Sequence, residues 1–268
     1  MSENTASCRS DRNADWRREL RDEMPAKDRT AIPRVEMPHL DPAYRVTCFG
    51  EVNSGLTPEQ AHEEATRCLD CPDPQCMTGC PVSIDIPGFI KNIQRGEILE
   101  ADAVLRNTSA LPAVCGRVCP QERQCESKCI YNRMKKPAVA IGYLERFAAD
   151  TAASMPGKPV VRRASLGIKV AVVGSGPAGL SFAGDMAARG FDVTVFEALH
   201  EIGGVLKYGI PEFRLPNSVV DHEINTLRQL GVEFVSDMIV GKTLSHDDLK
   251  QMGFKGIFVA SGAGLPRF

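Results

Sequence analysis

The chain has 268 residues, 43% of them hydrophobic, so it has material for two domains of ordinary size and is not disordered throughout. Its 32 basic and 34 acidic residues give a formal net charge of -2, which excludes a polyelectrolyte attraction to nucleic acid or anionic lipid. The charged N-terminus lacks the apolar core of a secretory signal, and no segment has the roughly 18 apolar residues of a membrane span. We therefore expect a cytoplasmic protein whose partner is a small molecule or another protein.

The first half of the chain holds all ten cysteines. It is predicted to be α-helical, because it has several short helical patterns and little that is typical of a strand. Residues 1–50 are charged and proline-bearing, and we expect an N-terminal arm that packs along a partner or a neighbouring domain. Residues 51–155 are the predicted helical domain. One helix should begin after Thr57, where Thr57-Pro58-Glu59-Gln60 has the pattern of a capping box, and should end at Cys68. Further helices are predicted at 86–94, 98–107 and 138–153.

The pattern changes after residues 156–166, which have two prolines and three basic residues and are predicted to be a linker. Residues 167–268 then predict a Rossmann-like α/β domain with a parallel sheet. Its first β-α-β unit is expected to consist of strand 169–173, helix 177–189 and strand 192–196. A helix at 217–230 and strands at 232–235 and 256–260 should follow.

A dinucleotide fingerprint lies inside that β-α-β unit, as Gly174-Ser175-Gly176-Pro177-Ala178-Gly179 between the first strand and its helix. Gly174 permits the tight turn, Gly176 lets the backbone approach a pyrophosphate, and Gly179 lets helix and strand pack closely. Glu197 ends the second strand, where a carboxylate can accept a hydrogen bond from a ribose hydroxyl. Flavin and nicotinamide dinucleotides share this fingerprint. The double glycine Gly203-Gly204 that follows favours FAD, although it also suits an ordinary turn.

Eight of the ten cysteines fall in two runs, Cys68, Cys71, Cys76 and Cys80-Pro81, then Cys115, Cys119-Pro120, Cys125 and Cys129. The first run has the spacing C-x2-C-x4-C-x3-C-P, close to the run by which two-cluster ferredoxins bind one iron-sulfur cube and lend the fourth thiolate to the other. Eight thiolates are enough for two [4Fe-4S] clusters. On this spacing Cys80 joins ligands of the second run, Cys115 among the candidates, and Cys129 returns to the first cube.

Two other uses of these cysteines remain open. Two zinc ions bound by four thiolates each would also account for all eight. Disulfides are a further alternative, which the lack of a secretory signal disfavours. The Cys-Pro pairs and the adjoining flavin-type domain favour redox metal over both.

Taken together, the sequence resembles the family of glutamate synthase small subunits, the flavin subunit of NADH-dependent ferredoxin:NADP oxidoreductase and the N-terminal part of dihydropyrimidine dehydrogenase. The resemblance runs from about Arg45 to the end. It is carried by RCLDCPDPQCMTGCPVSIDIPGFIKNI, LPAVCGRVCPQERQCESKCI, IGYLERFAAD, VVGSGPAGL and EIGGVLKYGIPEFRLP. It implies an α-helical domain with two [4Fe-4S] clusters followed by an FAD domain, and in full-length members an NADPH-binding domain that this chain is expected to lack.

The resemblance also implies a ligand set. One cluster would take Cys68, Cys71, Cys76 and Cys129, and the other Cys80, Cys119, Cys125 and Glu145. Cys115 would then bind no iron, whereas spacing alone favours it over Glu145, which could also be a solvated helix carboxylate. The flavin would lie over 174–178, with its ribose on Glu197 and further contacts at Gly203, Gly204, Leu206 and Arg214.

The function expected from the resemblance is an electron-transfer module that passes electrons from NADPH through FAD and two [4Fe-4S] clusters to a partner subunit. The cofactors would carry the chemistry, and no side chain is required as an acid or base. Within the enzymes, the same module could serve a ferredoxin:NADP oxidoreductase, a sulfide dehydrogenase or a dihydropyrimidine dehydrogenase. If the chain is not an enzyme, it could be a cluster-binding scaffold without turnover.

Overall fold

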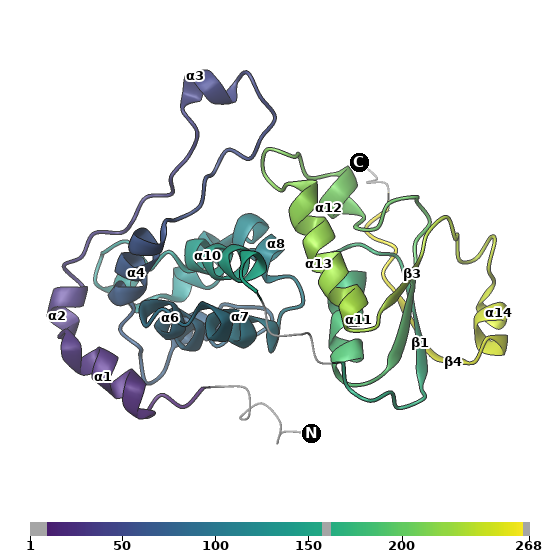
Figure 1. The fold of residues 1–268 in the computed structure, drawn as a ribbon, viewed down its shortest axis with the longest axis horizontal. Helices are drawn as coiled ribbons and strands as arrows, with labels where there is room; N and C mark the ends of the chain where they lie inside the picture. The colour runs from purple at the N-terminus through teal and green to yellow at the C-terminus, as the bar shows by residue number, and fades with distance from the viewer. Residues whose placement is uncertain (1–9, 157–161, 265–268) are drawn as a thin grey trace. The chain divides into compact units, whose positions relative to one another are not determined.

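The structure, a computed structural model, describes residues 10–156 and 162–264, and the chain forms two compact units, Met1–Lys158 and Pro159–Phe268. Figure 1 shows the helices and strands of each unit. Residues 157–161 of the predicted linker lie outside the described residues, as do the first nine residues of the predicted arm.

The first unit is built from helices, and its described residues contain no strand beyond an isolated bridge between His39 and Asn53. This confirms the predicted helical class. The helices are α1 (Asp15–Glu23), α2 (Ala26–Arg29), α3 (Pro42–Arg45), α4 (Pro58–Arg67), α5 (Gln75–Thr78), α6 (Ile86–Gln94), α7 (Ile98–Arg106), α8 (Pro112–Val118), α9 (Ile130–Arg133) and α10 (Ile141–Ser154), with short 3-10 turns η1 (Gln121–Arg123) and η2 (Glu126–Lys128).

The capping box of α4 is present as predicted. The Thr57 hydroxyl accepts from the backbone N–H of Gln60 at 3.3 Å, and the Gln60 side chain accepts from the Thr57 backbone N–H at 3.0 Å. These two bonds satisfy backbone donors that the first turn of a helix leaves open. The helix ends at Arg67, and Cys68 is its C-cap, with its backbone N–H donating to the Ala65 carbonyl.

Helix α6 has the predicted bounds, and α7 ends one residue early, but α10 begins at Ile141 rather than at 138. The predicted start was wrong because side chains from elsewhere hold the preceding backbone. The Ala138 carbonyl accepts from Arg34 at 2.9 Å and from Arg67 at 3.1 Å. The Ala140 N–H donates to Glu64 at 2.7 Å, so these residues have no need of helical hydrogen bonds.

The core of this unit surrounds α6, all of whose residues are buried, and includes Phe89, Ile90, Leu105, Leu144 and Ala148. Helices α8 and α10 cross closely at Gly116. A Cβ atom there would lie 2.5 Å from the backbone nitrogen of Arg146, so only glycine allows this approach. The crossing sets the distance between the side chains on the two helices.

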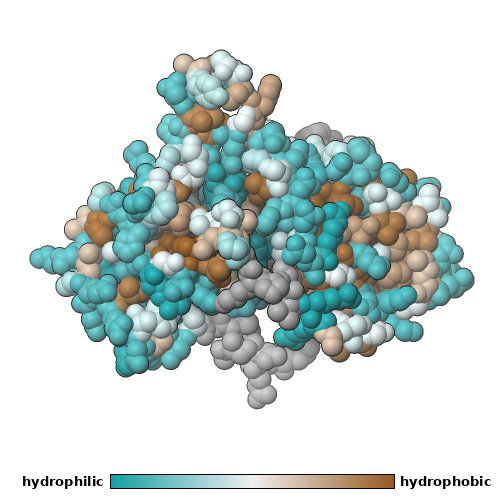
Figure 2. Space-filling view, in the orientation of Figure 1, coloured by the Kyte–Doolittle hydropathy of each residue, from teal (hydrophilic) through white to brown (hydrophobic). Residues whose placement is uncertain are grey.

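The described part of the N-terminal arm packs on the helices of its own unit, which is one of the two arrangements that we expected. Arg29 donates to the Thr66 carbonyl at 2.9 Å, and the Val35 N–H donates to Glu64 at 2.8 Å. The loop that carries α3 instead projects from the helices (Figure 1). Its residues Val46 and Phe49 are about four-fifths exposed, and Figure 2 shows brown, apolar side chains there among hydrophilic ones.

The second unit is an α/β domain with a parallel four-stranded sheet, as predicted. Strands β1 (Lys169–Val173), β2 (Asp192–Phe196), β3 (Glu233–Val235) and β4 (Phe254–Val259) lie in the order β3-β2-β1-β4. In register, Val172 pairs with Val195 of β2 and with Phe258 of β4. Helices α11 (Pro177–Ala188), α12 (Val205–Tyr208), α13 (Asn217–Gln229) and α14 (His246–Gln251) connect the strands.

Strand β4 begins two residues before its predicted start, because Phe254 pairs with Lys169 and a register shift follows. The side chains of Ala171, Phe196, Leu249 and Phe254 form a core against this sheet. Among the helices that the structure describes, none combines the length and the apolar character that a membrane crossing needs.

Candidate functional site

Four of the predicted ligands come together in the first unit. Cys68, Cys71, Cys76 and Cys129 line a cavity of about 390 Å³, whose walls are otherwise largely apolar, with Ile86, Ile90, Tyr131 and Ile141 among them. Cys68 follows α4, Cys76 lies in α5, and Cys129 lies directly before α9. Cysteines from distant parts of the chain thus line one cavity.

The thiols in this cavity influence one another. Burial raises the pKa of Cys71 to about 11, and the charges of Cys68 and Cys129 add to the rise. Burial also raises the pKa of Cys68, against the charge of Lys91 and a hydrogen bond that the Asp70 backbone donates. Binding of a metal cluster would therefore have to displace protons from the buried thiols.

A second group forms around Cys125. Burial raises the pKa of Cys125 to about 12, and the charges of Glu126, Glu145 and Cys80 add to the rise. The pKa of Cys119 is lowered by a hydrogen bond with Cys115, against burial and the charges of Glu145, Cys125 and Cys80. Cys80 therefore lies with cysteines of the second run, although it follows Cys76 closely in the sequence.

Glu145 and Cys115 both lie beside this second group. Glu145 is only 5% exposed, so it is not a solvated helix carboxylate. Its neighbour Arg146 forms ion pairs with Glu51 at 3.1 Å and Asp150 at 3.3 Å. Cys115 lies one helical turn before Cys119 on α8, with its sulfur 3.9 Å from the Ser109 hydroxyl. Both remain candidates for the eighth ligand.

The donor atoms suit iron. Thiolates are soft ligands that iron-sulfur clusters and zinc share. Among the residues that the structure describes, no three His, Cys, Asp or Glu side chains form a site for one metal ion. In a cube each protein ligand binds a different iron, so the ligands stand around the cluster rather than converging on a single ion.

The dinucleotide fingerprint occupies the turn between β1 and α11. Gly174 has φ +101°, and a Cβ atom there would lie 2.4 Å from the Ala260 carbonyl oxygen. A Cβ on Gly179 would lie 2.0 Å from the Gly174 carbonyl oxygen, but one on Gly176 would meet nothing within 4 Å. Pro177 and Ala178 open the first turn of α11, whose N–H groups suit an anion. The space over Gly176 therefore fits a pyrophosphate.

Glu197 and the double glycine adjoin the same turn. The Glu197 carboxylate is buried and accepts from the Ser175 backbone N–H at 2.8 Å, from the Ser175 hydroxyl, and from the Leu199 N–H at 2.9 Å. The Gly203 N–H donates to the Ser175 hydroxyl at 2.9 Å, and a Cβ on Gly204 would lie 2.8 Å from the Gly176 Cα. The predicted ribose ligand thus holds the fingerprint turn in place.

Two further predicted contacts lie outside that group. Leu206 is buried in α12, and its backbone N–H donates to the Gly203 carbonyl at 3.1 Å. Arg214 is exposed, and its backbone N–H donates to the Pro211 carbonyl at 2.9 Å. A flavin contact of Arg214 stays a prediction.

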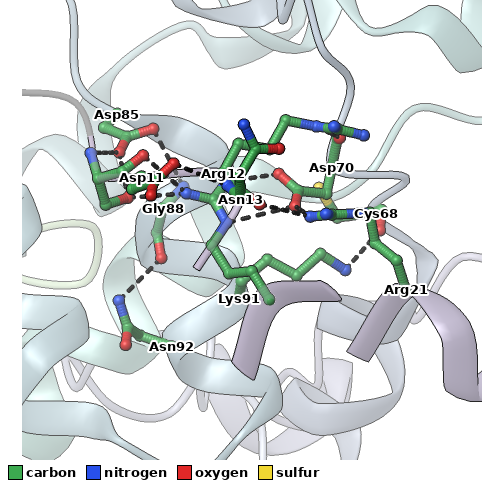
Figure 3. A network of polar contacts seen from close by, with 12 residues as sticks. Asp11, Arg12, Asn13, Arg21, Cys68, Asp70, Asp85, Gly88, Lys91 and Asn92 are labelled. Carbon is green, nitrogen blue, oxygen red and sulfur yellow. Dashed lines mark hydrogen bonds and ion pairs between the residues drawn. The ribbon is translucent and has the colours of Figure 1, made fainter. Parts of the chain in front are cut away.

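A polar network that was not predicted from the sequence surrounds the Cys68–Cys71 turn (Figure 3). Asp70 is fully buried and accepts from Arg17 and Arg21, and Lys91 donates to the Cys68 carbonyl at 2.6 Å. Burial lowers the pKa of Lys91 to about 8, which leaves it cationic at neutral pH. The available signal was the spacing of Arg17 and Arg21, four residues apart and so on one face of a helix.

Known proteins resemble both units. Residues 45–156 match the family described as dihydropyrimidine dehydrogenase domain II, 4Fe-4S cluster, and residues 172–238 match an NAD(P)-binding Rossmann-like domain. The glutamate synthase [NADPH] small chain of Azospirillum brasilense is 38% identical over 80% of this chain and 44% of its own length. The corresponding small chain of Escherichia coli K12 is 37% identical over 86% of this chain and 49% of its own.

A third relative has a different name. The NAD-dependent dihydropyrimidine dehydrogenase subunit PreT of Escherichia coli O157:H7 is 38% identical over 81% of this chain and 53% of its own length. The chain spans about half the length of the curated relatives that it matches.

Proposed function

Because this chain is a homologue of the glutamate synthase small chains and the PreT subunits, with a 4Fe-4S domain followed by an NAD(P)-binding Rossmann-like domain, we propose that it is the electron-transfer module of an NADPH-dependent oxidoreductase. Electrons would pass from NADPH through FAD and two [4Fe-4S] clusters to a partner subunit. The observation that carries the proposal is the presence of two separate groups of cysteines in one helical unit, each drawing on both cysteine runs.

These two groups support a proposed assignment of the ligands. Cys68, Cys71, Cys76 and Cys129 would bind one cluster, and Cys80, Cys119 and Cys125 the other, with Glu145 as its fourth ligand. When bound, the clusters and the flavin supply the one-electron and two-electron steps of the transfer. The protein itself excludes water, since the first cavity is lined mainly by apolar side chains, and it fixes the positions of the ligands.

The flavin would lie on the fingerprint turn. Its pyrophosphate would take the space over Gly176 and the N–H groups of the first turn of α11, and its ribose would approach Glu197. The two hydrogen bonds from Ser175 hold the carboxylate at the turn, and its other oxygen has a free lone pair beside the bond from Leu199.

The deciding measurement is the absorption spectrum of anaerobically purified protein, with iron, sulfide and flavin quantified. About eight irons and one flavin per chain are expected, as two four-iron cubes and one dinucleotide site require. Zinc in place of iron, or a colourless protein, would reject the proposal.

Glutamate synthesis and pyrimidine reduction are the two candidate reactions, because relatives of both names match at the same identity. We place glutamate synthesis first, since the Escherichia coli K12 small chain matches 86% of this chain and PreT matches 81%. The two are separated by an assay of the chain with each partner subunit. Because this chain is expected to lack the NADPH-binding domain, dithionite replaces NADPH as the reductant in both assays. One assay follows glutamate formation from glutamine and 2-oxoglutarate, and the other follows reduction of a pyrimidine.

A further inference from the structure

Positive charge is concentrated beside the Cys68–Cys71 turn (Figure 3). The side chains of Arg17, Arg29 and Lys91 are at most 2% exposed, and Arg21 completes the group at its edge. Within the described residues, the carboxylate that faces these cations is Asp70. Asp85 is linked to Arg17 only through the Ser10 hydroxyl, which donates to Asp85 and accepts from Arg17. Burial lowers the pKa of Arg29, and the charge of the exposed Glu23 opposes that fall without a direct ion pair. Buried cations therefore outnumber buried carboxylates here.

Asp70 forms ion pairs with two of these cations and fixes the turn. It has φ +50°, an unusual conformation for a residue other than glycine, and it stands between two proposed ligands of one cluster. Arg17 donates to both of its carboxylate oxygens, and Arg21 donates to Oδ2 at 2.6 Å. Arg12 donates to the Asp70 carbonyl at 2.7 Å. The arm therefore holds both the side chain and the backbone of this turn.

The other two cations face neutral oxygen atoms. Lys91 donates to the Cys68 carbonyl at 2.6 Å and to the Gln94 side chain at 2.7 Å. Arg29 donates to the Thr66 carbonyl at 2.9 Å and approaches the Cys68 carbonyl at 3.5 Å. Asp70 acts on both through its charge, but neither forms an ion pair within the described residues. Burial of a cation without a direct ion-pair partner is costly, so the arrangement is best explained by an anion in the adjacent cavity.

We propose that Arg17, Arg21, Arg29 and Lys91 form a cationic shell that raises the reduction potential of the cluster held by Cys68, Cys71, Cys76 and Cys129. The inference rests on the proposed function. A cluster with four thiolate ligands is anionic, and the electron that reduces it adds one negative charge. Nearby positive charge in a medium of low dielectric constant therefore stabilises the reduced cluster more than the oxidised one.

The second cluster lacks this shell among the described residues. The cations that flank its proposed ligands, Arg117 and Arg146, form ion pairs with Glu51 and Asp150. Its ligands also include the carboxylate of Glu145, with the Glu126 carboxylate near Cys125. The first cluster is consequently the one of higher potential, on which a transferred electron comes to rest.

The test is a redox titration of the whole chain, purified anaerobically and followed by electron paramagnetic resonance. Lys91→Gln removes the charge and keeps a hydrogen-bonding group, and Lys91→Met removes both. Arg95→Gln is the matched control, because Arg95 stands at the end of the same helix, exposed, against Trp16 and Asn92 rather than the turn. Both Lys91 variants should shift the reduced-to-oxidised ratio of one cluster about tenfold towards the oxidised form. This corresponds to a fall of about 59 mV in the reduction potential of that cluster. Arg95→Gln should leave the potential unchanged.

The outcomes are distinguishable. Wild-type protein without iron would reject the proposed function itself. Wild-type protein with both clusters, and a Lys91→Gln potential equal to that of Arg95→Gln, would overturn only the cationic shell. If the Lys91 variants bind no iron, Arg21→Gln is titrated in their place. The Arg21 side chain is 18% exposed, and its substitution removes only one contact to Asp70. An unchanged potential in Arg21→Gln would then overturn the inference, and a lowered one would support it.

Discussion

Gly179 packs so closely on Gly174 that a Cβ atom on the first would lie 2.0 Å from the carbonyl oxygen of the second. Gly176 lies between them in the sequence, and a Cβ there would meet nothing within 4 Å. The three fingerprint glycines therefore serve two needs. Gly174 and Gly179 are required by the packing of the chain itself, whereas Gly176 leaves room for something that the chain does not supply.

This difference predicts opposite results for two alanine variants. Gly176→Ala should fold with an unchanged melting temperature and bind FAD at least tenfold more weakly, because its methyl group takes space that the pyrophosphate needs. Gly179→Ala should lose about 1–3 kcal/mol of stability, because the methyl group meets backbone that cannot move aside. Thermal unfolding without flavin and a fluorescence titration with FAD measure the two effects. Normal FAD binding by Gly176→Ala would contradict the proposed flavin position.

The eighth cluster ligand can be identified with a pair of variants. We expect Glu145→Ala to lose or alter the electron paramagnetic resonance signal of one cluster, because Glu145 is a buried carboxylate beside Cys119 and Cys125. Cys115→Ser should keep both signals and about eight irons per chain. The reverse result, with a signal lost in the serine variant only, would assign the site to Cys115.

Asp70 should matter for stability in the absence of iron. Asp70→Ala leaves Arg17 and Arg21 without their shared carboxylate, and breaking such a buried pair costs about 3–5 kcal/mol. Urea unfolding of the iron-free protein can be followed by the fluorescence of Trp16, the only tryptophan, which lies against Arg17. Arg21→Gln is the control and should cost less, because Arg21 is partly exposed. Equal losses in the two variants would argue that Arg17 is not held by Asp70.

The crossing of α8 and α10 gives a further prediction. Gly116→Ala should destabilise the helical unit by about 1–3 kcal/mol, because its Cβ would lie 2.5 Å from the Arg146 backbone nitrogen and force the helices apart. The same movement would displace Cys119 from Glu145, so iron content should fall as well. Gly50→Ala, where a Cβ meets nothing within 4 Å, should change neither quantity. Circular dichroism and iron analysis provide the measurements.

Most helices and strands of the core could be predicted because their signals are local. The capping box at Thr57 marks the start of α4, and the run Lys169–Val173 with the glycines after it marks β1. The start of α10 could not be predicted in this way. It depends on Arg34 and Glu64, which lie far from it in the sequence and take up its backbone groups.

The burial of Arg17 in the arm could not be predicted for a related reason. A charged segment normally lies in solvent, and nothing local distinguishes Arg17 from its exposed neighbour Arg18. Arg17 is buried because Asp70, 53 residues away, supplies a counter-charge. The identity of the eighth cluster ligand was equally beyond the sequence, since Cys115 and Glu145 approach the same group of cysteines from two different helices.

The interleaving of the two cysteine groups has a consequence for how the protein is made. Cys80 lies with Cys119 and Cys125, while Cys129 lies with Cys68. Each group therefore contains cysteines from both runs, and the two groups are interleaved along the chain. A nascent chain that has been translated only as far as Cys80 offers no complete site of either kind. If the two groups bind clusters as proposed, neither cluster can be inserted with all its ligands until the helical half has been translated almost to its end.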